Sequence, residues 1–126
     1  MLKPVSKLES GGVLLVFTHQ EGLGFWSDGR FSVELLHQKL VEKILALLSP
    51  QERVNARGQM VPMEEFSVKK APRRFWGRQL LGYYIVRLHF GRGEYRRTVS
   101  FRYVRSSEDN FNGHVFHHPV RRNRAK

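Results

Sequence analysis

The sequence predicts an α+β domain in which an antiparallel sheet of about four or five strands packs on one amphipathic helix. Three observations support this fold class. Residues 33–48 repeat apolar side chains at helical spacing. Residues 83–104 alternate apolar and polar side chains on either side of a glycine-containing turn. The short apolar run Val13–Phe17, which follows two glycines, indicates a further buried strand.

The segment after this first strand is punctuated by glycine. Gly22 and Gly24 both lie there. Residues 25–27 are expected to form a short strand that turns at Asp28-Gly29, a dipeptide typical of tight turns.

Residues 33–48 are expected to form the main helix, with Ser32 as its N-cap and Glu34 near the positive end of its dipole. Its apolar stripe is expected to face the core, and a dimer or partner face is the alternative. The capping-box pattern over residues 49–52 predicts a second, short helix to about Arg57. A helix-turn-helix is disfavoured, because this second helix would be short and only weakly basic.

The clearest strand pattern lies over residues 83–104, which are expected to form the long central hairpin of the sheet around a loop at 91–94. One of its faces is expected to be apolar. The other is expected to be mixed, and its prominent side chains are Arg87, His89, Arg96 and Arg102. Residues 69–78 are expected to form a basic loop, because they contain Pro72 and Gly77.

The length of 126 residues suits a single domain, expected over residues 1–113 with a basic tail at 114–126. The sequence contains no cysteine, so disulfides, iron–sulfur clusters and cysteine nucleophiles are excluded. No apolar run approaches the roughly 20 residues that cross a bilayer. We therefore expect a cytoplasmic protein that contacts no membrane and holds no metal or cofactor.

Positive charge is concentrated in the second half of the chain. The net charge is +11, and residues 1–66 carry 7 Lys and Arg against 8 Asp and Glu, whereas residues 67–126 carry 15 against 3. Arginine outnumbers lysine by 15 to 7, and its planar fork binds phosphate and stacks on bases. Such asymmetry is typical of nucleic-acid binding.

These features predict a non-catalytic nucleic-acid-binding protein that uses the hairpin face, the basic loop and the tail. Aromatic side chains beside the cations, namely Phe75, Trp76 and Tyr83, are candidates for stacking on bases. The choice between DNA and RNA stays open, as does a homodimer or larger complex. The predicted binding residues are Lys69, Lys70, Arg73, Arg74, Trp76, Arg78, Arg87, His89, Arg92, Arg96, Arg102, Arg121, Arg122 and Arg124.

Two other functions use the same basic surface. A metal-independent ribonuclease needs a base, an acid and cations around the phosphate, which His89 and His117 could supply with the arginines. Small bacterial toxin ribonucleases share this general layout, but the likeness is one of architecture and charge only. A module that binds an acidic protein is the second alternative. A metal site at His114, His117 and His118 is disfavoured, because no carboxylate is an obvious further ligand.

Overall fold

The structure is a computed structural model that describes residues 12–75 and 78–118, and for residues 72–75 and 78–81 it describes the backbone alone. The helices and strands, in chain order, are β1 (Val13–Leu15), α2 (His19–Gly24), β2 (Trp26–Ser27), β3 (Arg30–Phe31), α3 (Val33–Leu45), the 3₁₀ turn η1 (Pro50–Glu52), β4 (Met63–Phe75), β5 (Arg78–Phe90), the 3₁₀ turn η2 (Gly93–Tyr95), β6 (Arg97–Arg105) and β7 (Gly113–His117).

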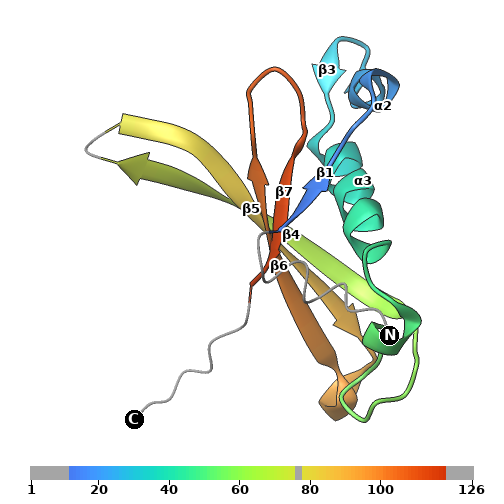
Figure 1. The fold of residues 1–126 in the computed structure, drawn as a ribbon. Helices are drawn as coiled ribbons and strands as arrows, with labels where there is room; N and C mark the ends of the chain where they lie inside the picture. The colour runs from blue at the N-terminus through green and yellow to red at the C-terminus, as the bar shows by residue number, and fades with distance from the viewer. Residues whose placement is uncertain (1–11, 76–77, 119–126) are drawn as a thin grey trace.

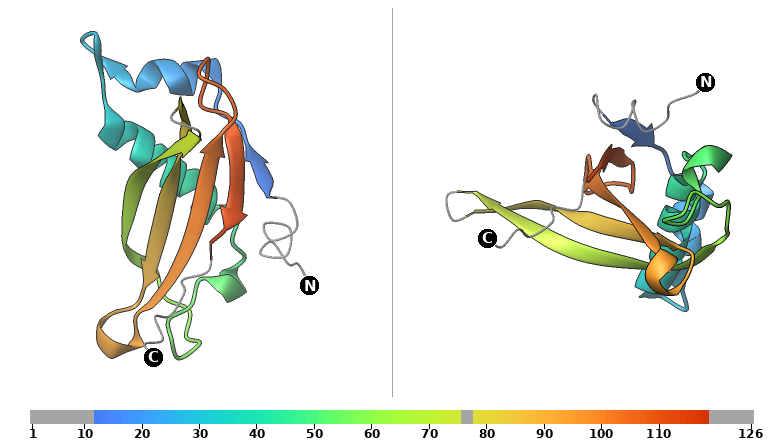
Figure 2. Two further views of the ribbon diagram at one scale, coloured as in Figure 1. Left: turned by 90° about the vertical axis from the view of Figure 1, so that its left-hand side faces the viewer. Right: turned by 90° about the horizontal axis from the view of Figure 1, so that it is seen from below.

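Five strands form one antiparallel sheet in the order β1-β7-β6-β5-β4. The first strand therefore pairs with the last, and the four later strands follow one another as a meander. Between β1 and β4 the chain crosses one face of the sheet through α2, a two-stranded hairpin of β2 and β3, and α3 (Figures 1 and 2). The predicted α+β fold with a sheet of about five strands is confirmed.

Helix α3 covers the sheet with its apolar stripe, so that stripe is core. Leu36, Leu40 and Ile44 are almost completely buried. The Ser32 hydroxyl accepts a hydrogen bond from the Leu35 amide at 3.3 Å, as its predicted N-cap role requires. The opposing apolar face of the sheet is also buried. It consists of Tyr84, Val86, Leu88, Phe90, Val99, Phe101, Tyr103 and Val115.

The predicted second helix is wrong. Ser49 and Glu52 do form the capping box, but only the 3₁₀ turn Pro50–Glu52 follows it. The Asn55 side chain then accepts hydrogen bonds from the amides of Arg57 and Gln59, at 2.9 and 3.0 Å. This local bonding turns the chain before another helical turn can form.

Helix α2 lies in the segment that contains Gly22 and Gly24, where no helix was predicted. Thr18 and Glu21 form a reciprocal capping box, with hydrogen bonds of 2.8 and 3.0 Å. Phe17 and Phe25, on either side of the helix, are buried and meet edge to face at 6.1 Å. The cap and these two rings outweigh the low helix propensity of glycine.

The predicted loop at 69–78 is also wrong, because β4 runs to Phe75 and β5 begins at Arg78. β4 is an edge strand, and the register shifts between Ala71 and Arg73, around Pro72. Proline is tolerated at such a position, since an edge strand with a bulge can lack one amide donor. β6 pairs with β5 only from Tyr83 onward, so the ends of β4 and β5 project as a two-stranded arm (Figure 1).

Strand β7 changes the expected boundary between domain and tail. Residues 114–117, assigned to the tail from the sequence, pair with β6 inside the sheet. Burial alternates at the start of β7, where His114 is exposed and Val115 is fully buried against the core. The rest of the predicted tail, residues 119–126, lies outside the described residues.

Candidate nucleic-acid interface

The face of the sheet that points away from α3, here called the outer face, carries a different chemistry from the core. Successive side chains of a strand point to opposite sides, so the register of the strands identifies its members. The first row across the strands consists of Lys69, Ile85, Arg102 and Phe116. The second row consists of Ser67, Arg87 and Ser100.

Arg87 and Arg102 are the central cations of the outer face. Neither has a carboxylate partner within 4.0 Å among residues 12–75 and 78–118. Arg102 is exposed, and its guanidinium lies 5.1 Å from the centre of the Phe116 ring. Arg87 is half-buried. Their charge is therefore not neutralised within the described protein.

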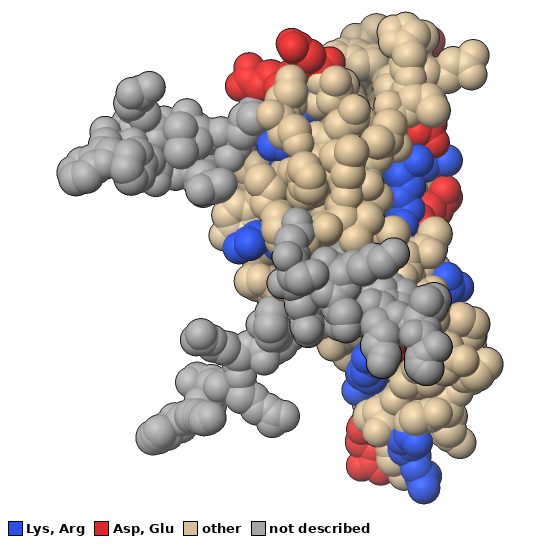
Figure 3. Space-filling model, in the orientation of Figure 1, with Lys and Arg blue, Asp and Glu red and all other residues tan. Residues whose placement is uncertain are grey.

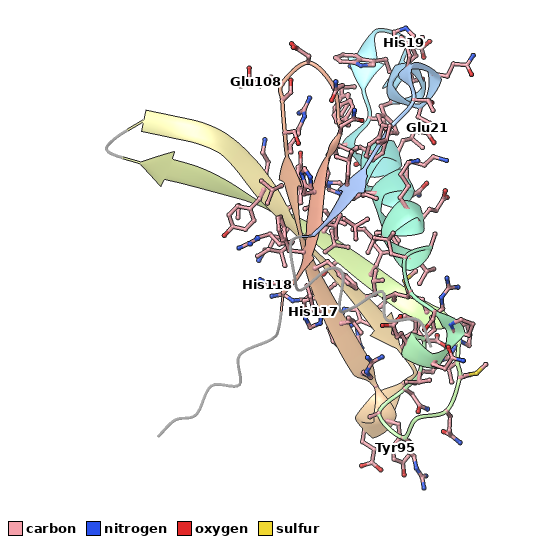
Figure 4. All side chains as sticks on the ribbon, viewed as in Figure 1. His19, Glu21, Tyr95, Glu108, His117 and His118 are labelled. Atoms are coloured by element: carbon pink, nitrogen blue, oxygen red, sulfur yellow. The ribbon has the colours of Figure 1, made fainter. Side chains whose placement is uncertain are left out.

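Two histidines border these arginines. The His118 amide donates to the Ser100 carbonyl at 2.9 Å, which brings this residue beside the second row. Burial lowers the pKa of His118, and the charges of Arg102 and Arg87 lower it further. Burial also lowers the pKa of His89, and the nearby charge of Arg96 lowers it further. Both rings are therefore mostly neutral at pH 7 and become cationic in acid. Figure 4 shows His118 at the end of β7.

A shallow hollow of about 430 Å³ opens on the outer face, lined by Tyr83, Arg102, Val104 and Phe116. It combines two aromatic rings with one guanidinium. A planar, anionic ligand such as a nucleotide needs this combination, because rings stack on bases and arginine binds phosphate.

Two of the predicted binding residues are instead engaged in ion pairs. Arg92 Nε lies 3.1 Å from Glu64 Oε1, and an Arg96 guanidinium nitrogen lies 3.3 Å from Glu65 Oε1. Glu64 and Glu65 belong to β4, so the sheet brings these acids beside arginines that follow β5. Arg92 and Arg96 are therefore weaker candidates for phosphate than Arg87 and Arg102.

Lys69 and Lys70 lie on opposite faces of β4. Lys69 is exposed in the first row of the outer face. Lys70 lies opposite Tyr84, and its Nζ is 6.0 Å from the centre of that ring, on the α3 side. The backbones of Arg73, Arg74 and Arg78 belong to the arm. The remaining predicted residues, which are Trp76, Arg121, Arg122 and Arg124, lie outside the described residues.

The structure places His89 and His117, the pair predicted for a ribonuclease, on opposite faces of the sheet. His89 is opposite Thr98 on the outer face, and its Nδ1 lies 2.8 Å from the Thr98 hydroxyl. His117 is opposite the buried Phe101, with ring centres 6.1 Å apart, on the α3 side. A base and an acid on opposite faces cannot act on one phosphate.

In the described part of the chain, no three His, Asp or Glu side chains gather closely enough to hold a metal ion. Within the same part, no helix has the length and apolar character to span a membrane. Comparison of the chain with protein-family models, with curated proteins and with solved structures finds no match.

Phe116 and His118 were not among the residues predicted for this surface. Their position depends on the pairing of β7 with β6, because that pairing sets Phe116 opposite Arg102. The adjacent apolar residues Val115 and Phe116 are the signal in the sequence that could have indicated this strand.

Proposed function

We propose that this protein binds nucleic acid without catalysis, and that the ligand lies across the outer face of the sheet. The observation that supports this most strongly is the pair Arg87 and Arg102, which no described carboxylate neutralises, beside the rings of Phe116 and Tyr83. Cations that repel one another on one surface are best explained by an anion that binds there.

The spacing of the two arginines suits a phosphate backbone. Arg102 is directly opposite Ile85, and Arg87 is two residues further along β5. Diagonal neighbours of this kind lie about 7–8 Å apart across antiparallel strands. Two long side chains at that separation can each reach one of two successive phosphates.

The aromatic hollow favours an unpaired strand over a duplex. Tyr83 and Phe116 are partly exposed. A sheet face with accessible rings can stack on unpaired bases, as in several single-strand-binding folds, and each base contributes about 1–3 kcal/mol. A base seated between Tyr83 and Phe116 would place its phosphate near Arg102. The arm, with Arg73 and Arg78 in its sequence, would extend the contact along the nucleic-acid strand from Lys69 of the first row.

A binding series tests this proposal. Labelled 12-nucleotide single-stranded DNA, single-stranded RNA and a 12-base-pair duplex are titrated with protein at 50 and 200 mM salt. We expect single strands to bind more tightly than the duplex, and affinity to fall about 50-fold or more over this salt range if four or more phosphates are contacted.

Polyglutamate of matched charge serves as the competitor, and gel analysis of the RNA after incubation serves as the check for cleavage. Equal competition by polyglutamate would overturn the nucleic-acid proposal in favour of an acidic protein partner. Cleavage abolished by His89→Gln would contradict the non-catalytic part. Equal affinity at both salt levels would contradict the phosphate contacts.

A further inference from the structure

A second surface, chemically unlike the outer face, lies at the end of the molecule where α2, the β2–β3 hairpin and the β6–β7 loop meet (Figure 1). We call it the end surface, formed by Leu23, Trp26 and Phe31 with Phe17 and Phe111 beneath them. Leu23 is 56% exposed, Trp26 54% and Phe31 37%. Large apolar side chains that are exposed together usually mark a place of interaction.

The rings of this end form one connected, ordered platform. Trp26 and Phe31 are paired across β2 and β3, with ring centres 5.1 Å apart. Phe31 stacks on Phe111 at 5.8 Å with an angle of 11° between the rings. Phe17 meets Phe111 edge to face at 6.2 Å. The platform is therefore held by the core on one side and open on the other.

A hollow of about 440 Å³ opens in this platform, with Leu23, Trp26 and Phe111 among the side chains that line it. His19 and Asp109 supply polar groups at the same hollow. An apolar depression with a few polar groups at its rim suits one large apolar side chain of a ligand.

Acidic side chains surround the end surface. Four of them have no ion-pair partner within the described ranges, namely Asp28, Glu34, Glu108 and Asp109. Two cations lie at the same end, Arg30 and Arg105, and Arg105 is held against the Phe111 ring at 4.3 Å. Figure 3 shows acidic side chains gathered at this end, by the β6–β7 loop. The excess of carboxylates repels phosphate and attracts cations.

We propose that the end surface is the docking site for a peptide segment of a partner protein, in which one large apolar residue is flanked by lysine or arginine. The apolar residue enters the hollow beside Trp26. The flanking cations approach Asp109 and its acidic neighbours. This proposal does not depend on nucleic-acid binding, since the outer face carries the opposite charge.

The test uses three acetylated and amidated pentapeptides. The first has a central phenylalanine with two lysines on each side, the second replaces phenylalanine by serine, and the third replaces the lysines by glutamate. Binding is followed by the NMR signal of the Trp26 indole N–H. The sequence contains two tryptophans, so the signal is assigned by its loss in Trp26→Ala.

We expect the first peptide to shift the Trp26 signal saturably, with a Kd at or below about 1 mM. The other two peptides should leave it unmoved at the same concentrations. Asp28→Asn with Asp109→Asn should weaken the first peptide by about threefold to tenfold. Leu23→Ser should weaken it at least tenfold, because it removes apolar contact from the hollow without touching Trp26.

Several results would overturn the proposal. These are equal binding of the serine or glutamate peptide, no shift with any peptide, or an unchanged Kd in both variants. Self-association that Leu23→Ser abolishes in sedimentation would assign the surface to a second copy of this chain instead. The far-UV circular dichroism spectrum and the thermal unfolding midpoint of Leu23→Ser should match those of the wild type, which shows that the variant is folded.

Discussion

Replacing Arg87 and Arg102 together with glutamine should weaken nucleic-acid binding and flatten its dependence on salt. Both side chains lie on the outer face and lack a described carboxylate partner. Glutamine retains much of the side-chain length and its hydrogen-bonding capacity but carries no charge. The substitution therefore removes the attraction to phosphate with little change in packing.

The size of the effect follows from counterion release. Each phosphate contact contributes about 0.7 to the slope of log affinity against log salt for a single strand. Loss of two contacts should reduce the slope by about 1.4. When salt rises from 50 to 200 mM, the fold-loss of affinity should therefore be about seven times smaller for the double variant than for the wild type.

Fluorescence anisotropy with a labelled 12-nucleotide strand, at five salt concentrations, measures this slope. The matched control is Lys39→Gln with Arg57→Gln, which removes the same charge from other places. Lys39 pairs with Glu42 on α3, and Arg57 stacks on Tyr95 at 4.8 Å. The reasoning is refuted if both double variants lose slope equally, or if the Arg87 and Arg102 variant keeps the wild-type slope.

Four further predictions concern pH and stability. Because the pKa values of His89 and His118 are depressed below 6.5, both rings gain charge only as pH falls below that value. Affinity for nucleic acid, measured by fluorescence anisotropy, should therefore rise about threefold or more from pH 7.5 to 5.5, and the rise should be smaller in His118→Gln. The same pKa shifts make the free protein less stable as pH falls below 6.5, because the unfolded chain then binds more protons than the folded protein. Thermal unfolding over that pH range measures this loss of stability. Leu40→Ala should cost about 2–5 kcal/mol in urea unfolding, because Leu40 is fully buried. Tyr103→Phe should cost about 1–2 kcal/mol, because the buried Tyr103 hydroxyl donates to the Phe111 carbonyl, which would lose its donor.

The longest periodic patterns of the sequence predicted the fold well. The helix over 33–48 and the hairpin over 83–104 appear as α3 and as β5 with β6. In these segments the same side chains that set the period also form the core. Local propensity and tertiary packing therefore point to the same structure.

The structure of shorter segments depends on tertiary contacts that the sequence pattern does not reveal. No helix was predicted around Gly22 and Gly24, but the capping box of Thr18 and Glu21 and the packing of neighbouring rings hold a helix there. Pro72 predicted a loop, but on an edge strand it falls at a shift in register. A pattern read along the chain does not show which strand lies at the edge of a sheet.

The sequence predicted that the candidate site is positively charged, but it did not show which of the arginines pair with carboxylates. Arg87 and Arg102 follow from alternation within one hairpin. The ion pairs of Arg92 with Glu64 and of Arg96 with Glu65 depend on pairing with β4, which only the fold reveals.

The two isoleucines of the chain provide the most direct test of nucleic-acid binding at the outer face. Ile85 lies between Lys69 and Arg102 on that face, and Ile44 is fully buried on α3. Selective labelling of isoleucine methyl groups therefore gives one NMR signal from each side of the sheet. A saturating single-stranded oligonucleotide should shift or broaden the Ile85 signal and leave that of Ile44 in place. An unmoved Ile85 signal at saturation, or equal shifts of both signals, would contradict binding at the outer face.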